Sequence, residues 1–115
     1  MPLVVQKYGG TSVGTPERIR NVAARIIETQ RHGTRVVAVI SAMAGVTDNL
    51  ISLARETSPQ PTTREMDILL ATGEHAASAL TAMAINALGG KAISLTGAEA
   101  GVLTDRTTAV HATHL

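Results

Sequence analysis

The sequence predicts an α/β fold, and three observations point to it. Short apolar runs alternate with longer segments of helical periodicity. Three of the apolar runs are followed by loops of small and polar residues. The order strand, helix, strand is that of a parallel βαβ unit with a right-handed crossover. The 115 residues contain no internal repeat, low-complexity tract or interdomain linker, so the chain is one domain or part of one.

The first half of the chain predicts the βαβ unit. Residues 3–5 are a short apolar run before two glycines, which indicates a buried strand. Thr15 followed by Pro16 is typical of a helix start, and Gly33 is typical of a helix end. Apolar residues between them recur on one helical face, at Ile19, Val22, Ala23, Ile26 and Ile27. Residues 36–40 are apolar throughout, which predicts a strand covered on both faces.

The second half predicts two helices and a third strand. A short helix is expected over residues 48–56, and Ser-Pro-Gln-Pro at 58–61 ends it. A long alanine-rich helix is expected over residues 64–88. Residues 91–95 then indicate a strand, which a third glycine-rich loop follows at 96–101. Beyond that loop the signals for secondary structure fade.

The composition excludes several classes of function. The net charge is +1 with both signs interspersed, which argues against nucleic acid or an anionic membrane as a partner. The chain has no cysteine, so disulfides, thiolate metal sites and cysteine nucleophiles are excluded. The N-terminus lacks the features of a signal peptide, and no uninterrupted apolar run reaches the ~18 residues of a membrane span. We therefore expect a cytoplasmic protein.

Three loops that follow the predicted strands form the first candidate site. They are Gly-Gly-Thr-Ser (9–12), Ser-Ala-Met-Ala-Gly-Val-Thr (41–47) and Thr-Gly-Ala-Glu-Ala-Gly (96–101). In a parallel sheet these loops share the edge at the carboxyl ends of the strands, where ligands bind. Backbone N–H groups there, with Lys7 beside them, suit an anion. A solvated strand-to-helix turn is the alternative for the first loop taken alone.

The first loop matches neither of two standard phosphate-binding motifs. Gly9 and Gly14 have the spacing of a Walker A loop, but Thr-Pro follows them instead of Lys-Ser or Lys-Thr. The glycine pattern of a dinucleotide-binding turn is also absent. Because Lys7 precedes the glycines, we expect its side chain to reach over the loop from the end of the strand.

Glu74 is the second candidate. It lies among small apolar residues on the long predicted helix, where a lone buried charge is costly. Glu74 is therefore exposed, paired or functional, and an ordinary surface glutamate is the alternative. Ser41 has no histidine or aspartate placed by the sequence to activate it as a nucleophile. His111 and His114 would lie one turn apart on a helix, but we expect no metal site there.

Five segments, taken in order, carry a resemblance to a known family. They are KYGGTS (7–12), ERIRNVA (17–23), VVAVISAMAGVTDNL (36–50), REMDILLATGE (64–74) and TGAEAGVLTD (96–105). The chain resembles the N-terminal part of aspartokinase, a member of the amino-acid kinase superfamily. The resemblance covers roughly the first hundred positions. KYGGTS is its most discriminating segment, because kinases for glutamate, acetylglutamate or UMP carry looser versions.

The resemblance implies a fold and an activity. The fold is a three-layer αβα sandwich on a mostly parallel sheet, of the carbamate kinase-like type. Residues 1–115 would be its N-terminal, amino-acid-binding part. The activity is transfer of phosphate from ATP to the side-chain carboxylate of L-aspartate. The product, aspartyl-4-phosphate, leads to lysine, threonine and methionine. ATP and Mg²⁺ are the implied cofactors, with Mg²⁺ carried mainly by the nucleotide.

The resemblance also implies a role for individual residues. Lys7 would be catalytic and contact the phosphates. Ser41 and Thr47 would bind aspartate, and Glu74 would hold its ammonium group. The loop that lines the meeting point of aspartate and phosphate would comprise Gly9, Gly10, Thr11 and Ser12. No protein nucleophile is needed, because the substrate carboxylate attacks.

The chain departs from the family in three places. His75 stands where members usually have arginine, and residues after Asp105 do not align cleanly. The chain also ends before the family's nucleotide-binding half and regulatory ACT domains. We therefore expect the 115 residues alone to be inactive, with a C-terminal half or a homo-oligomer completing the enzyme. The alternatives are a non-catalytic module that keeps the aspartate- and phosphate-binding loops, or a poorly folded fragment with exposed strand edges.

Overall fold

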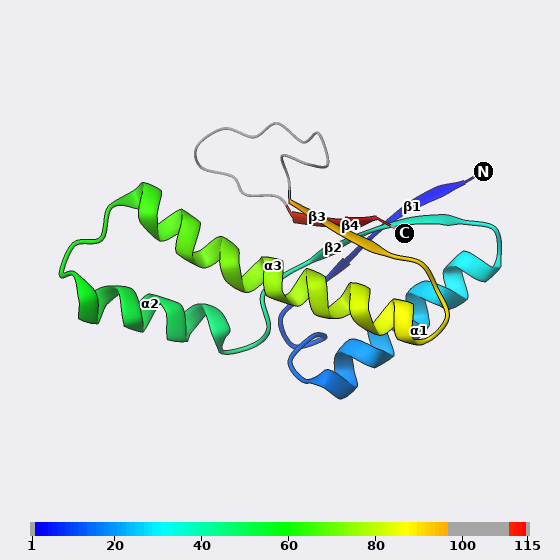
Figure 1. Cartoon of the computed structure of the whole chain (residues 1–115), viewed down its shortest axis with the longest axis horizontal. Helices are drawn as coiled ribbons and strands as arrows, with labels where there is room; N and C mark the ends of the chain where they lie inside the picture. Colours follow the sequence, from blue (N-terminus) through cyan, green and yellow to red (C-terminus); the bar gives the residue numbers. More distant parts are fainter. Residues whose placement is uncertain (1, 97–110, 115) are drawn as a thin grey trace.

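The computed structural model describes residues 2–96 and 111–114 of the chain. Strands and helices alternate through most of it, as the sequence predicts (Figure 1). The elements are β1 (Leu3–Tyr8), α1 (Pro16–Arg31), β2 (Arg35–Ile40), α2 (Val46–Thr57), α3 (Thr63–Ala87), β3 (Ile93–Thr96) and β4 (His111–His114).

The described strands form one sheet in the order β1-β2-β4-β3. β1 and β2 are parallel, in a register that pairs Leu3 with Arg35 and Tyr8 with Ile40. β4 lies between β2 and β3 and is antiparallel to both, so β1, β2 and β3 all run in one direction. α1 and α3 lie on the same side of the sheet and pack against each other, while α2 packs against α3 (Figure 1). The α/β fold class is confirmed.

β4 is the element that the sequence analysis does not predict. Its four residues, His-Ala-Thr-His, carry no apolar run, and their pairing partners lie far away in the sequence. The segment is extended, so His111 and His114 do not lie one helical turn apart. The geometry considered for a histidine pair on a helix is therefore not present.

The core lies between α1, α3 and the sheet. Val36, Ala38 and Ile40 of β2 face the helices, and α3 contributes Ala77 and Ile85. All five predicted apolar positions of α1 are buried, namely Ile19, Val22, Ala23, Ile26 and Ile27. Burial of this face stabilises α1 through the hydrophobic effect.

β1 extends three residues further than its apolar run predicts. Gln6 is tolerated within this strand because both the nitrogen and the oxygen of its side-chain amide have hydrogen-bond partners. The Gln6 Nε2 donates to Thr29 Oγ1 of α1 at 3.2 Å, and the Tyr8 hydroxyl donates to Gln6 Oε1 at 2.9 Å. Because strand side chains alternate between faces, Leu3, Val5 and Lys7 occupy the opposite face and are exposed.

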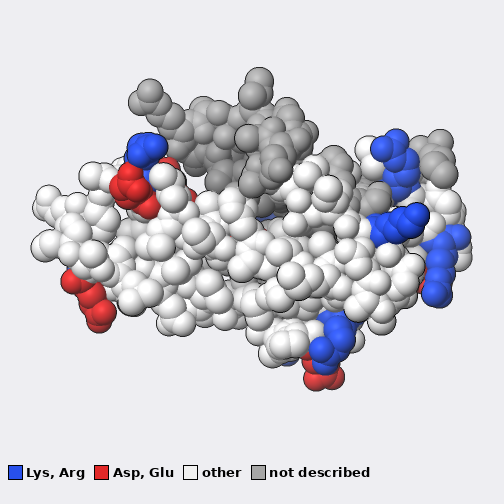
Figure 2. Space-filling model, viewed as in Figure 1, with Lys and Arg blue, Asp and Glu red and all other residues white. Residues whose placement is uncertain are grey.

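α3 is long and apolar enough to cross a membrane by length and composition alone, with a mean hydropathy of 1.3 over 18 residues. This differs from the sequence analysis, which considered only uninterrupted apolar runs. Here α3 packs against α1, α2 and the sheet, as the core helix of a globular domain does. Its outer side is uncharged over most of its length, and the charged side chains in this view lie near the two ends and at the lower edge of the molecule (Figure 2).

Candidate functional site

The loops after β1 and β2 contact each other directly. The Ser41 N–H donates to the Tyr8 carbonyl at 3.1 Å, and the Ala44 N–H donates to the Gly10 carbonyl at 3.1 Å. A Cβ atom on Gly10 would lie 3.1 Å from the Ala42 carbonyl oxygen, which is backbone and cannot easily move. The neighbouring loop therefore favours glycine at position 10, whatever ligand binds. The prediction that these two loops meet at one edge of the sheet is confirmed.

Gly9 differs from Gly10. Its carbonyl accepts a hydrogen bond from the Ser12 N–H at 3.1 Å, which forms the turn. A Cβ atom on Gly9 would meet nothing within 4 Å, and Gly9, Thr11 and Ser12 are exposed. This part of the loop is therefore open to a ligand.

α3 contacts the loop after β2 at Gly73. A Cβ atom on this residue would lie 3.1 Å from Val46 Cγ1, 3.3 Å from Ala42 Cβ and 3.4 Å from Leu50 Cδ1. The absence of a side chain lets α3 pack closely against the start of α2 and the loop before it. Glu74, the next residue along α3, is consequently adjacent to the segment that carries Ser41 and Thr47.

The three residues predicted to bind an amino acid differ in exposure. Ser41 follows directly after β2 and is half-buried. Thr47 lies in the first turn of α2 and is exposed, whereas Glu74 on α3 is half-buried. The structure brings all three to the region around Gly73, but their roles stay predictions.

The N-terminus of α2 is open. Its N-cap is Gly45, with φ +85°, which has no side chain to accept a hydrogen bond from the N–H groups of the first turn. These N–H groups carry the positive end of the helix dipole, which favours an anionic group beside Thr47. This feature escapes sequence reasoning, which places the start of the helix at Asp48 instead of Val46.

Lys7 lies at the same edge of the sheet as the two loops, but on its other face. Tyr8 packs against α1, so the preceding residue, Lys7, projects from the face of the sheet opposite α1 and α3. Lys7 pairs in register with Val39, two residues before Ser41, which places it at the same edge of the sheet. The structure thus brings Lys7 to the edge of the sheet that carries the loops, on the face turned away from α3.

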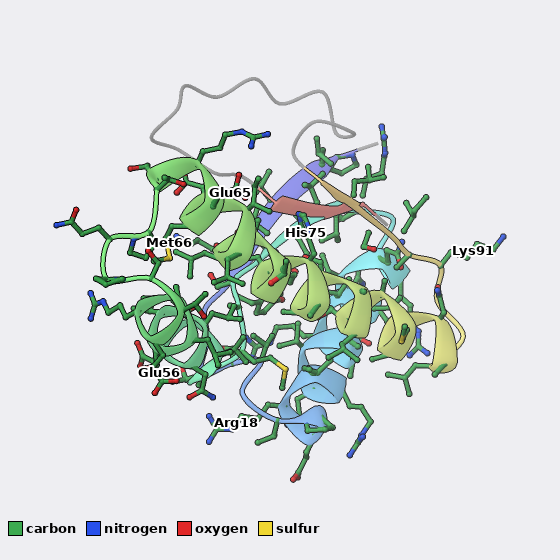
Figure 3. All side chains as sticks on the ribbon, turned by 60° about the vertical axis from the view of Figure 1, so that its left-hand side comes forward. Arg18, Glu56, Glu65, Met66, His75 and Lys91 are labelled. Atoms are coloured by element: carbon green, nitrogen blue, oxygen red, sulfur yellow. The ribbon has the colours of Figure 1, made fainter. Side chains whose placement is uncertain are left out.

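Arg18, an exposed residue of α1, is a structural residue of this loop that the sequence analysis does not single out. Its Nη1 donates to the Thr11 carbonyl at 2.8 Å, from the N-terminal end of the helix (Figure 3). The hydrogen bond joins residues seven positions apart across the turn. The periodicity of α1 contains no signal for it.

One of the predicted features lies partly outside the described residues. The third glycine-rich loop begins at Thr96, the last residue of β3, and continues beyond the described part of the chain.

His75, where the family usually has arginine, is half-buried in the middle of α3 (Figure 3). Within residues 2–96 and 111–114 there is no group of three or more acidic, histidine or cysteine side chains that could hold a metal.

Comparisons with known proteins agree with the resemblance. A family model described as "Amino acid kinase family" matches residues 2–115. An aspartokinase of Mycolicibacterium smegmatis is 58% identical over 107 residues, which are 93% of this chain and 25% of that protein. An aspartokinase of Corynebacterium glutamicum is 57% identical over 104 residues, which are 90% of this chain and 25% of that protein.

A solved structure is also similar. The crystal structure of aspartate kinase from Synechocystis has a TM-score of 0.81 at 54% identity, covering 84% of this chain and 16% of that one. The chain thus spans about a quarter of the length of the curated relatives that it matches.

Proposed function

Because the chain belongs to the amino acid kinase family, we propose that it is the amino-acid-binding part of an aspartokinase. Such an enzyme transfers the γ-phosphoryl group of ATP to the side-chain carboxylate of L-aspartate, giving aspartyl-4-phosphate for lysine, threonine and methionine synthesis. The observation that carries the proposal is the meeting of both loops and α3 around Gly10, Ala42 and Gly73. We place the reaction in the cytoplasm.

In this proposal the amino acid lies beside the contact between α3 and the start of α2. The Glu74 carboxylate pairs with the ammonium group of aspartate. The hydroxyl of Thr47 and the uncapped N-terminus of α2 suit a carboxylate, because they offer donors at the positive end of a helix dipole. Ser41 supplies a further hydroxyl from the preceding loop.

The phosphate is handled by the first loop and the strand before it. Lys7 and the N–H groups of Gly9, Gly10, Thr11 and Ser12 would offset the charge that develops on the phosphoryl oxygens. The exposure of Lys7 and the open space around Gly9 support this role. We propose that Mg²⁺ is held by the phosphates of ATP, and that the rest of the nucleotide site comes from a C-terminal half or a second subunit.

The test is formation of the acyl phosphate in the protein that contains this chain. Hydroxylamine traps aspartyl phosphate as a hydroxamate, whose amount is measured with MgATP and either L-aspartate or L-glutamate. Aspartate-dependent hydroxamate supports the proposal, and its absence with a folded protein contradicts it.

A non-catalytic binding module is the second candidate, favoured by the open space around Gly9 and the uncapped N-terminus of α2, which suit an anion whether or not a reaction follows. Calorimetric titration of the 115-residue chain separates the two. Aspartate or phosphate binding without ATP binding favours the module, and tight binding of ATP with Mg²⁺ argues against it.

A further inference from the structure

A polar pocket lies beside the first loop, on the α1 side. It has a volume of about 210 Å³ and opens to solvent between the end of β1 and the first turns of α1. Its lining residues are Tyr8, Ser12, Arg18, Asn21, Val22 and Arg25. Only Ser12 is shared with the residues assigned to aspartate and phosphate in the proposed function.

The lining is rich in hydrogen-bond donors and contains no carboxylate. Arg18, Asn21 and Arg25 follow one another at helical spacing and therefore share one face of α1. In the described part of the chain, the ion pairs of α1 join Glu28 to Arg31 and to His32, and neither Arg18 nor Arg25 pairs with a carboxylate. Two guanidinium groups thus face one small pocket without a carboxylate partner among the described residues.

We propose that this pocket binds an oxyanion of the phosphate class, held by the guanidinium groups of Arg18 and Arg25 and the hydroxyl of Ser12. Guanidinium groups present several donors in a planar fork, which matches the paired oxygens of a phosphate. Two positive charges match the double negative charge of this ligand class. Free inorganic phosphate and the terminal phosphate of a nucleotide are its two sources. The inference does not depend on the aspartokinase assignment.

An oxyanion in this position would connect α1 to the first loop. Arg18 already donates to the Thr11 carbonyl, and the next residue in the loop is Ser12. A ligand that joins Ser12 to Arg25 therefore stiffens the segment from Gly9 to Ser12 from its outer side.

Tyr8 offers a spectroscopic signal for binding. It is the one aromatic residue of the chain and is 7% exposed. Burial raises the pKa of its hydroxyl, and the positive charge of Arg25 lowers it in part. A bound anion offsets that charge, so the pKa of Tyr8 is expected to rise further when the pocket is occupied.

The experiment is a calorimetric titration of the protein with orthophosphate at low ionic strength. Arg25→Gln is compared with Arg20→Gln, because Arg20 is exposed on the same helix and does not line the pocket. Arg25→Gln is expected to weaken binding about tenfold or more, since it removes charge-assisted hydrogen bonds. Arg20→Gln is expected to change it by less than about twofold. Both side chains are exposed, and thermal unfolding checks that both variants fold.

Repeating the titration with ATP separates the two sources. Orthophosphate binding that depends on Arg25 supports a free phosphate as the ligand. ATP binding that depends on Arg25, without orthophosphate binding, supports the nucleotide's phosphate. The proposal is overturned if neither anion binds saturably, or if Arg20→Gln weakens binding as much as Arg25→Gln does. A Tyr8 titration that is the same with and without the bound anion also contradicts it.

Discussion

α1 and α2 each follow a strand and a small-residue loop, but they are attached to the protein in different ways. The N-terminus of α1 is capped by Thr15, whose Oγ1 accepts a hydrogen bond from the Arg18 N–H at 3.2 Å. α1 buries a full apolar face. α2 starts at Gly45 without a side-chain cap and has no fully buried residue. α1 is therefore held by a cap and a buried face, whereas α2 has neither a side-chain cap nor a fully buried residue.

The first loop and α2 are held in place by different kinds of contact. The first loop is held by its own turn, by Arg18 and by the neighbouring loop. The position of α2 depends instead on packing of Val46 and Leu50 against Gly73 of α3. A site built from both therefore joins a loop held by several hydrogen bonds to a helix that is positioned by a close contact with α3.

The largest expected effect concerns the stability of α1. Ile26 is fully buried, so Ile26→Ala should lower the free energy of unfolding by about 2–5 kcal/mol, because it leaves a cavity. Leu53→Ala on α2, where the side chain is 57% exposed, should cost less than about 1 kcal/mol. Urea unfolding of the chain measures both. Equal losses would remove the distinction between the two helices.

The next effect is catalytic. In the enzyme that contains this chain, Lys7→Ala should lower kcat by about 10²–10³-fold, because one preorganised charge is lost. Lys91→Ala is the matched control, since Lys91 is exposed and lies beyond the end of α3. A Lys7→Ala enzyme within threefold of the unmodified kcat would exclude Lys7 from the reaction.

The contact that positions α2 should be sensitive to size. Gly73→Val should destabilise the protein by about 1–3 kcal/mol, because the new side chain overlaps Val46 and Ala42. The helix propensities of valine and glycine differ by only a few tenths of a kcal/mol, so packing determines the result. Ala76→Val, at an exposed position of the same helix, is the control. Chemical denaturation of both variants tests this, and an unaffected Gly73→Val protein would show that α2 is free to move.

Glu74 tests the amino-acid side of the site. Glu74→Gln should raise the KM for aspartate by about tenfold, with a smaller change in kcat, because an ion pair with the ammonium group is lost. Glu65→Gln on the first turn of α3, whose carboxylate contacts Arg64 at 2.8 Å, should leave the KM unchanged. Steady-state kinetics with varied aspartate distinguishes the two. An unchanged KM for Glu74→Gln would contradict the ammonium assignment.

The smallest effect concerns the helix caps. Thr15→Ala should cost about 1 kcal/mol of stability, because a first-turn N–H of α1 loses its acceptor. Thr62 is the N-cap of α3 but makes no side-chain hydrogen bond, so Thr62→Ala should have almost no effect. Thermal unfolding resolves the difference, and equal shifts for the two variants would argue against the cap at Thr15.

The sequence by itself determines α1 almost completely. Thr15, Pro16 and Gly33 act on neighbouring residues, so the signals that begin and end the helix are local. The limits of β1 are not local. Gln6 interrupts an apolar run, but its backbone pairs with Ala38 of β2, and its amide donates to Thr29 on α1, 23 residues away.

Some features of the candidate site can likewise be predicted from the sequence, and others depend on the tertiary structure. The residue types in the two loops, and the resemblance to the aspartokinases, are enough to predict Lys7, Gly10, Ser41 and Glu74 as a group. Tertiary structure alone decides which residues come into contact, namely Gly10 with Ala42 and Gly73 with Val46. It also decides that the helices cover one face of the sheet, so that Lys7 projects from the other face. It also brings Arg18 and Arg25 to one pocket. Such contacts depend on how helices pack on the sheet, and this packing joins residues that are distant in the sequence.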